Sequence, residues 1–168
     1  MIFVTVGTHE QQFNRLVEAI DKIAKESNEK YFVQTGFSDY EPQYCEWKKM
    51  CTYDEMQEKI EEARIVITHG GPSSFISPLQ KCKIPIVVPR TKRYNEHVND
   101  HQVKFCKEVS DRYENIIFVE DVSKLKGIID NYNEIANNMK QESTSNNQYF
   151  CNEFKKIVNG LWEKKHKK

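Results

Sequence analysis

The sequence predicts an α/β fold in which a parallel sheet of six strands is covered by helices on both faces. Two observations predict it. Short apolar runs rich in β-branched residues alternate along the chain with longer stretches whose apolar residues recur at helical spacing. The short runs show no polar and apolar alternation, which is typical of strands buried on both faces of a parallel sheet. With 168 residues, 38% of them hydrophobic, the chain is long enough for one domain, with or without a tail.

The first half of the chain supplies three strands and two helices. Residues 1–7 (MIFVTVG) are a β-branched apolar run ended by a glycine, which predicts a buried strand. Residues 10–27 place apolar side chains three and four positions apart, as the buried face of a helix requires. The strand predicted at 30–36 (KYFVQTG) also ends at a glycine, and weaker signals predict a third strand at 45–51 (CEWKKMC). The helix predicted at 52–63 begins with a threonine, a residue type that caps helices.

The second half continues the alternation through three more strands and three more helices. The strands are predicted at 64–71 (RIVITHGG), 84–89 (IPIVVP) and 115–120 (NIIFVE). The helices are predicted at 73–82, 95–112 and 121–140, the last with an Asp-Val-Ser start. Open α/β sheets bind ligands beyond the carboxyl ends of their strands, so binding residues are expected in the loops that follow the strands.

The residues after 140 differ in composition from the rest. Residues 141–148 (QESTSNNQ) are polar and of low complexity, which indicates a linker, and 149–162 return to an amphipathic helical pattern. We therefore expect an α/β domain over 1–140, followed over 141–168 by a linker and a C-terminal helix with a basic tail. That tail (WEKKHKK) is either a frayed, solvated terminus or a weak attractor for an anionic membrane surface.

Composition excludes several classes of protein. Acidic and basic residues balance at 25 each, so the net charge favours neither nucleic acid nor another polyanion as a partner. Five cysteines form an odd set without a CxxC pair, which indicates reduced thiols in the cytosol rather than a disulfide framework. No apolar run approaches the roughly 20 residues that a membrane-spanning helix needs, so any work at a membrane is expected to depend on recruitment.

The loop over 68–75 (THGGPSSF) carries the first binding signal. Two glycines permit tight turns after a strand, Pro72 suits the first position of a helix, and Ser73 and Ser74 follow it. Free N–H groups and serine hydroxyls at a helix start attract phosphate. The loop has neither the GxGxxG nor the P-loop pattern, so a plain strand-to-helix turn with a serine cap is the alternative.

A second polar cluster follows the fifth predicted strand. It begins with the basic residues Arg90, Lys92 and Arg93 and continues into hydrogen-bonding side chains that suit the hydroxyls of a sugar. These are Asn95, Glu96, His97, Asn99, Asp100, His101 and Gln102. The spacing of His97 and His101 raises zinc as an alternative, but the chain has neither an HExxH pattern nor a cysteine pair to support it. A solvated polar helix face is the third interpretation.

A third signal lies at the end of the first predicted strand. Gly7 and Thr8 allow the backbone to approach a ligand closely, and His9 follows them. An imidazole at such a place can accept a proton near neutral pH. The alternative is a histidine with a surface or capping role only.

Taken together, three stretches resemble the C-terminal domain of glycosyltransferase family 28. They are 7–17 (GTHEQQFNRLV), 67–90 (ITHGGPSSFISPLQKCKIPIVVPR) and 95–102 (NEHVNDHQ). The chain is similar in particular to the short bacterial subunits of capsule and exopolysaccharide synthesis, and to the small subunit of the eukaryotic transferase that adds the second GlcNAc to a dolichol-linked sugar. The resemblance implies a Rossmann-like sheet that forms the C-terminal, nucleotide-sugar half of a GT-B glycosyltransferase.

The resemblance also implies roles for individual residues. The Gly-Gly-Ser loop would hold the diphosphate of a UDP-sugar, the acidic-x-Gln segment would hold the donor sugar, and the first loop would face the cleft. The corresponding residues are His69, Gly70, Gly71, Ser73 and Ser74, then Asp100, His101 and Gln102, and finally Gly7 and Thr8. Arg90, with Lys92 and Arg93, is expected to assist in holding the phosphates.

One position departs from the family pattern. Eight residues after the histidine, where many members have a glutamate that binds the ribose, this chain has Ser77. We expect Glu96 or a partner to replace that contact.

A GT-B enzyme needs two α/β domains, and this chain supplies one. The resemblance therefore implies an inverting transferase that moves a hexosyl unit from a UDP-sugar to a polyprenyl-pyrophosphate-linked sugar in surface polysaccharide synthesis, without a cofactor or metal. A membrane-anchored partner subunit would bind the acceptor and bring this cytoplasmic chain to the inner face of the membrane, with the C-terminal helix and Trp162 as the docking segment.

Three questions stay open in this interpretation. The base that deprotonates the acceptor is either His9 or a group of the partner. The chain is either the catalytic donor half or a non-catalytic accessory subunit of the same fold. A stand-alone phosphosugar enzyme is the third possibility, which the length of the chain disfavours.

Overall fold

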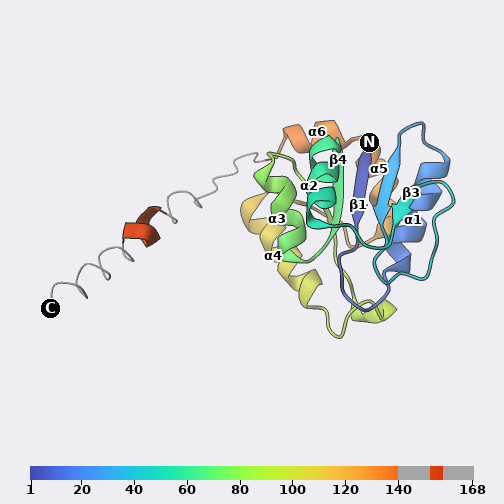
Figure 1. Cartoon of the computed structure of the whole chain (residues 1–168), viewed down its shortest axis with the longest axis horizontal. Coiled ribbons are helices and arrows are strands. Elements are labelled where there is room, and N and C mark those ends of the chain that lie inside the picture. Colours follow the sequence, from blue (N-terminus) through green and yellow to red (C-terminus); the bar gives the residue numbers. More distant parts are fainter. Residues whose placement is uncertain (140–151, 157–168) are drawn as a thin grey trace.

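The computed structural model describes residues 1–139 and 152–156, and it shows the predicted parallel sheet (Figure 1). The strands are β1 (Ile2–Thr5), β2 (Tyr31–Gln34), β3 (Glu46–Lys48), β4 (Ile65–His69), β5 (Ile86–Val88) and β6 (Ile117–Phe118). Their order is β3-β2-β1-β4-β5-β6, and neighbouring strands are parallel throughout. The chain moves outward from β1 to β3 on one side and from β4 to β6 on the other. The order therefore reverses between β1 and β4, which is where open α/β sheets bind ligands.

The helices are α1 (Asn14–Lys25), α2 (Tyr53–Glu62), α3 (Pro72–Gln80), α4 (His101–Tyr113), α5 (Leu125–Asp130) and α6 (Tyr132–Asn137), with 3-10 turns η1 (Lys92–Tyr94) and η2 (Val122–Lys124). Helices α1, α5 and α6 cover one face of the sheet, where Leu16 and Leu125 share a buried cluster with Val4. Helices α2, α3 and α4 cover the other face, where Ile60 packs with Phe3. Successive residues of β1 thus point to opposite layers, as the pleat of a strand requires.

The predicted cap of the second helix is confirmed. The Thr52 side chain accepts a hydrogen bond from the Glu55 N–H at 3.2 Å, and the Glu55 carboxylate accepts one from the Thr52 N–H at 2.8 Å. This reciprocal capping box satisfies two backbone donors that the helix start would otherwise leave unpaired.

Two helices differ most from their predicted bounds. Helix α4 begins at His101 rather than at residue 95, because Asn95 is left-handed (φ 56°) and Asp100 accepts from the Lys92 N–H at 2.8 Å, closing a loop before the helix. The helix predicted at 121–140 divides into η2, α5 and α6. It breaks at Asn131, whose side chain donates to the Gly127 carbonyl at 2.8 Å.

The C-terminal predictions fall largely outside the described residues. Residues 152–156 are helical, within the helix predicted at 149–162. The predicted linker and Trp162 lie outside the described part of the chain. Over residues 1–139 and 152–156, no helix has the length and apolar character needed to cross a membrane.

Candidate functional site

The loops after β1 and β4 lie side by side at the carboxyl edge of the sheet. Thr5 is in register with Thr68, so the loop at Gly7 and the His69–Gly71 turn follow adjacent strands at the switch point. Gln34, at the end of β2, fixes the first loop: its Oε1 accepts from Thr5 Oγ1 at 2.5 Å, and its Nε2 donates to the Gly7 carbonyl at 3.0 Å. Gln34 is not among the residues predicted for the site, although a polar residue inside the apolar run FVQTG is a usable signal.

The imidazole of His69 lies between two glycines, and this contact explains much of the His-Gly-Gly turn. A Cβ atom on Gly7 would lie 2.3 Å from His69 Cε1, and one on Gly71 would lie 2.5 Å from His69 Nε2. Gly7 also has a φ of +78°, a conformation that favours glycine. Gly70 faces α4 instead, where an added Cβ would lie 2.8 Å from Cys106 Sγ. Packing alone therefore requires all three glycines.

Burial keeps His69 neutral. Its pKa is lowered to about 4, first by burial and then by the positive charge of Arg90, while a contact with the Thr5 carbonyl acts in the opposite direction. The ring edge lies 3.5 Å, a long contact, from Ser74 Oγ at the start of α3. His69 thus shapes the turn and orients a hydroxyl rather than carrying charge.

The start of α3 leaves the Ser73 N–H without a hydrogen-bond partner among the described residues, whereas Pro72 has no N–H and the Ser74 N–H donates to the Gly71 carbonyl at 3.0 Å. Gly71 is the N-cap, Pro72 is the first helical residue, and no side chain caps the helix. Ser73 is exposed and Ser74 is half-buried. Ser77 Oγ donates to the Ser73 carbonyl at 3.1 Å, so its hydroxyl is used within the helix. The Ser73 N–H and the positive end of the helix dipole suit an anion such as phosphate.

Arg90 is placed differently from its predicted role as a phosphate contact. Its side chain is 0% exposed, and its guanidinium donates four hydrogen bonds to backbone carbonyls. The acceptors are Val6, Gln11, Gln12 and Glu96, at 2.8 to 3.1 Å. Burial lowers the pKa of Arg90 to about 10, with the Glu96 charge opposing the shift, so the group stays charged at neutral pH. Arg90 ties the loops after β1 and β5 together, and the prediction is corrected accordingly.

Glu96 is likewise hydrogen-bonded within the protein. Its carboxylate is fully buried; Oε1 accepts from Arg15 Nε at 2.9 Å, and Oε2 accepts from an Arg15 terminal nitrogen and from the Thr91 N–H, both at 3.0 Å. A carboxylate paired in this way is not available to a ribose, so the prediction that Glu96 replaces the family glutamate is also corrected. Lys92 and Arg93, in η1, are exposed.

In the segment from Asp100 to Gln102, some polar groups are hydrogen-bonded within the protein and others are left for a ligand. Gln102 Oε1 accepts from the Arg90 N–H at 3.1 Å, while its Nε2 makes no hydrogen bond to any of the described residues. One carboxylate oxygen of Asp100 accepts from the Lys92 N–H, and the other has no hydrogen-bond partner among the described residues. The exposed His101 ring stacks on Phe105, with centroids 5.9 Å apart. Gln102 Nε2 and Asp100 Oδ2 are therefore the groups that this segment leaves for a ligand.

His9 and His97 face each other across the two loops, with ring centroids 5.0 Å apart. His9 Nδ1 accepts from the Gln11 N–H at 3.2 Å, and His97 Nδ1 accepts from the Asn99 N–H at 3.3 Å. These bonds assign the proton of each neutral ring to Nε2, which makes both rings donors. The pKa of His9 is lowered by burial, then by Arg90 and His97, with Glu10 opposing. In this arrangement the Nε2–H of neutral His9 is a donor, and the role of His9 as the base stays a prediction.

The zinc alternative finds no support in this geometry. His97 turns toward His9, whereas His101 turns toward Phe105. Across the described residues, no group of three or more His, Cys, Asp or Glu side chains is arranged to hold a metal ion.

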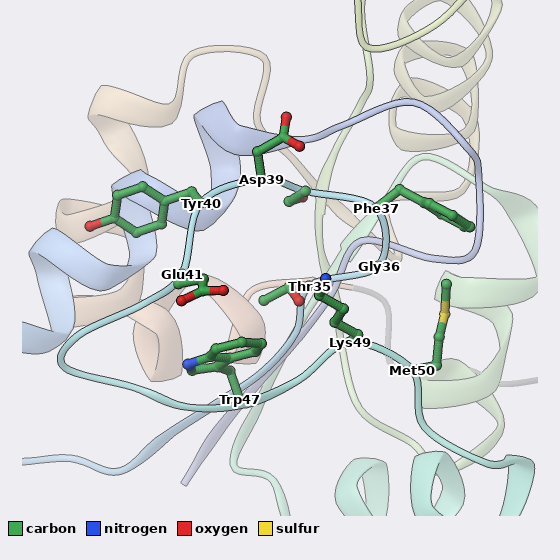
Figure 2. A pocket seen from close by; sticks show the side chains of 10 residues that line it. Thr35, Gly36, Phe37, Asp39, Tyr40, Glu41, Trp47, Lys49 and Met50 are labelled. Atoms are coloured by element: carbon green, nitrogen blue, oxygen red, sulfur yellow. The ribbon is translucent and has the colours of Figure 1, made fainter.

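A pocket of about 500 Å³ opens at the same edge, beside β2 and β3 (Figure 2). Its walls come from the residues that follow β2 and from the end of β3. They are Thr35, Gly36, Phe37, Ser38, Asp39, Tyr40, Glu41, Trp47, Lys49 and Met50. Sequence analysis predicts none of them as site residues; the glycine that ends the run FVQTG and the tryptophan in the weak third strand are the signals that mark this place.

Comparison with known proteins identifies a family for the chain. The Glycosyltransferase family 28 C-terminal domain model matches residues 1–161. Among solved structures, the glycosyltransferase SnogD from Streptomyces nogalater is similar at 14% sequence identity and a TM-score of 0.42, over 82% of this chain and 39% of that one. This chain thus spans about two fifths of the length of SnogD. No curated protein matches the sequence.

Proposed function

Because the chain belongs to the glycosyltransferase family 28 C-terminal domain family, we propose that it is the donor-binding half of an inverting glycosyltransferase. The donor is a UDP-sugar, and the acceptor is a sugar on a polyprenyl pyrophosphate, in the synthesis of a surface polysaccharide. A second, membrane-anchored subunit binds that acceptor and recruits this chain to the inner face of the membrane.

The uncapped start of α3 is the observation that carries this proposal. It lies at the switch point of the sheet, directly after the His69–Gly71 turn, with Ser73 exposed beside it. The Ser73 N–H, the two serine hydroxyls and the positive end of the helix dipole lie together there, and the Ser74 hydroxyl is 3.5 Å from neutral His69. This is the chemistry that holds a diphosphate without a metal.

In the proposed reaction, the acceptor hydroxyl attacks the anomeric carbon of the donor sugar while the bond from that carbon to the diphosphate oxygen breaks. The departing UDP keeps the bonding electrons, and the donors at the start of α3 stabilise the added charge. Gln102 Nε2 and Asp100 Oδ2 orient the sugar. His9 and His97 donate from Nε2, so the base that takes the acceptor proton comes from the partner subunit.

The test is UDP binding by calorimetry with Ser73→Asp. A carboxylate at this position repels the diphosphate, and we expect at least a tenfold loss of affinity. The same charge interacts favourably with the helix dipole, so the free energy of unfolding should stay equal or rise by about 0.5 kcal/mol. Ser73→Asn, which is similar in size and uncharged, is the matched control and should keep most of the affinity. Unchanged UDP binding by Ser73→Asp would contradict the proposal.

Sugar transfer to a polyprenyl-pyrophosphate-glucose acceptor then tests whether this chain and the membrane partner are both needed for activity. The chain alone, the membrane partner alone and both together are compared across a panel of UDP-sugars. We expect activity only in the combination, abolished by Ser73→Asp. The panel also identifies the donor.

A non-catalytic accessory subunit is the second candidate. It is favoured by Ser77 and Glu96, which are both engaged inside the protein and leave the ribose without the family contact. Activity in the partner alone, unaffected by Ser73→Asp in this chain, would establish that role instead.

A further inference from the structure

The pocket beside β2 and β3 is separate from the start of α3 but shares its edge of the sheet. Thr35 and Gly36 follow β2, and Lys49 and Met50 follow β3. Since neighbouring strands lie about 4.8 Å apart, β2 and β3 are displaced sideways from β4 by roughly 10 and 14 Å. Figure 2 shows the chain from Thr35 to Met50 running around the opening. A ligand in this pocket would be a neighbour of the bound donor.

Thr35 supplies a buried and unpaired polar group in the pocket wall. The residue is 1% exposed, its N–H donates to the Lys48 carbonyl at 3.0 Å, and its carbonyl accepts from the Ser38 N–H at 3.0 Å. Its Oγ1 is buried without a hydrogen-bond partner among the described residues. A buried hydroxyl without a partner destabilises the fold, and a ligand hydroxyl would satisfy it.

The loop that forms the opposite wall is held in place by contacts outside the pocket. The Asp21 carboxylate accepts from Tyr40 OH at 2.8 Å and from the N–H groups of Gln43 and Tyr44 at 2.7 to 3.0 Å. Asn14 Oδ1 accepts from the Asp39 N–H at 2.9 Å. These bonds tie the loop to α1, so the pocket keeps its shape without a ligand, which lowers the entropy cost of binding.

Three side chains leave their functional groups to the pocket. The Glu41 carboxylate, the Lys49 ammonium and the Trp47 indole N–H have no hydrogen-bond partner within the described part of the chain. In Figure 2, Phe37 and Tyr40 point outward at either side of the opening, which leaves the Trp47 ring as the aromatic surface at its base.

This combination favours a sugar ring over other ligands. A hexose has an apolar face that packs on one aromatic ring and a rim of hydroxyls that donate and accept. Glu41 and Asp39 disfavour an anion such as phosphate. A single aromatic platform surrounded by polar groups is less suited to a flat base, which is bound best between two apolar faces.

We propose that this pocket binds an uncharged hexose ring, the terminal sugar of the lipid-linked acceptor whose lipid pyrophosphate the partner subunit holds. Trp47 packs against the apolar face, Glu41 and Lys49 bond the rim, and Thr35 Oγ1 receives one ring hydroxyl. The assignment of the bound hexose to the lipid-linked acceptor rests on the proposed function. The proposal that the pocket binds a saccharide does not.

The test is a titration of the full chain, followed by the 15N–1H signal of the Trp47 indole, with methyl β-glucoside as the probe. We expect saturable shifts at millimolar concentrations. Thr35→Val should weaken binding about fivefold, the effect of losing one neutral hydrogen bond, without lowering stability, because the hydroxyl has no partner in the free protein. Thr68→Val is the matched control: its Oγ1 is also buried and unpaired, and it lies outside the pocket.

The outcomes separate the two proposals. No saturable shift with the glucoside, or equal affinity in Thr35→Val and wild type, would overturn the saccharide site. UDP binding measured on the same samples should be unchanged by Thr35→Val; failure of wild type to bind UDP would overturn the proposed function and leave the pocket standing. Glucosyl-pyrophosphoryl-polyprenol in micelles should bind at least tenfold more tightly than the free glucoside, and equal affinities would overturn the acceptor as its source.

Discussion

At the scale of single residues, His69 determines which side chains the two neighbouring loops tolerate. Its ring occupies the space that a Cβ on Gly7 or Gly71 would need. The two glycines differ in one respect: Gly71 has an ordinary φ of −77°, whereas Gly7 has a φ of +78°. Steric contact alone excludes a side chain at Gly71, and contact together with backbone conformation excludes one at Gly7.

That difference predicts a double-mutant result. Gly71→Ala should lower the free energy of unfolding by about 1–3 kcal/mol through overpacking. In a His69→Ala background, where the ring is absent, the same change should cost less than about 0.5 kcal/mol. Gly7→Ala should keep about 1 kcal/mol of its cost in that background, because the positive φ remains. Urea unfolding of the five variants measures these values, and equal costs in both backgrounds would show that the ring is not the obstacle.

The sequence shows that this turn is unusual but does not show why. Phosphate binding and a tight strand-to-helix turn both account for glycines at residues 70 and 71. The third reason is close packing of Gly71 on the His69 imidazole and of Gly70 on Cys106 from α4, which depends on the three-dimensional arrangement of the turn and the helix. Likewise, Arg90 and Glu96 have the composition of a ligand site, and only the fold shows that backbone carbonyls and Arg15 occupy them.

At the scale of elements, Arg90 joins segments that are remote in sequence. Its guanidinium donates at the same time to carbonyls after β1, before α1 and after η1, so another positively charged residue cannot replace it. A lysine carries the same charge on a single nitrogen and cannot span these acceptors. The role of Arg90 is therefore to fix the loops that flank the candidate site.

Arg90→Lys should lower the free energy of unfolding by about 2–4 kcal/mol, because buried carbonyls lose their donors. Arg93→Lys, on an exposed arginine of the same loop, should change it by less than about 0.5 kcal/mol. Chemical denaturation gives both values. A stable Arg90→Lys protein with weakened UDP binding would instead restore Arg90 as a phosphate contact.

Element types are more predictable than element ends. Apolar periodicity correctly indicates each of the strands and the helices that cover them, because burial on the sheet imposes that pattern. The start of α4 and the division of 121–140 depend on single hydrogen bonds, from Lys92 to Asp100 and from Asn131 to Gly127, which the pattern does not encode. The pocket beside β3 escapes prediction for the same reason, since the loop that encloses it is held by Asp21 from α1.

At the scale of the whole molecule, the buried neutral His69 makes stability depend on pH. Its pKa is about 4 in the folded chain and near 6.5 when exposed. Between these values the unfolded chain binds a proton that the folded chain does not, so acidification favours unfolding. The contribution of His69 is fully present above pH 6.5 and is lost as the pH falls toward 4.

We expect the free energy of unfolding to fall by up to about 3 kcal/mol between pH 7 and pH 4 on account of this residue. His9, whose pKa is also lowered, adds in the same direction. In His69→Gln the dependence should be visibly flatter. Urea unfolding at pH 7, 6 and 5 measures this dependence for wild type and for His69→Gln. If the free energy of unfolding falls equally with pH in both proteins, His69 is not the cause.

The register of β1 has a further consequence for how the chain acquires its fold. Ile2 pairs with Tyr31 on one side and with Ile65 on the other, so the central strand lacks its second neighbour until β4 has been synthesised. Its apolar faces are covered later still, by helices that include α5 and α6. Sheets built from such distant pairings fold slowly, over milliseconds to seconds. The apolar run of β1 is thus synthesised well before β4 and the later helices that complete its burial, and this places the nascent chain among those that benefit from chaperones.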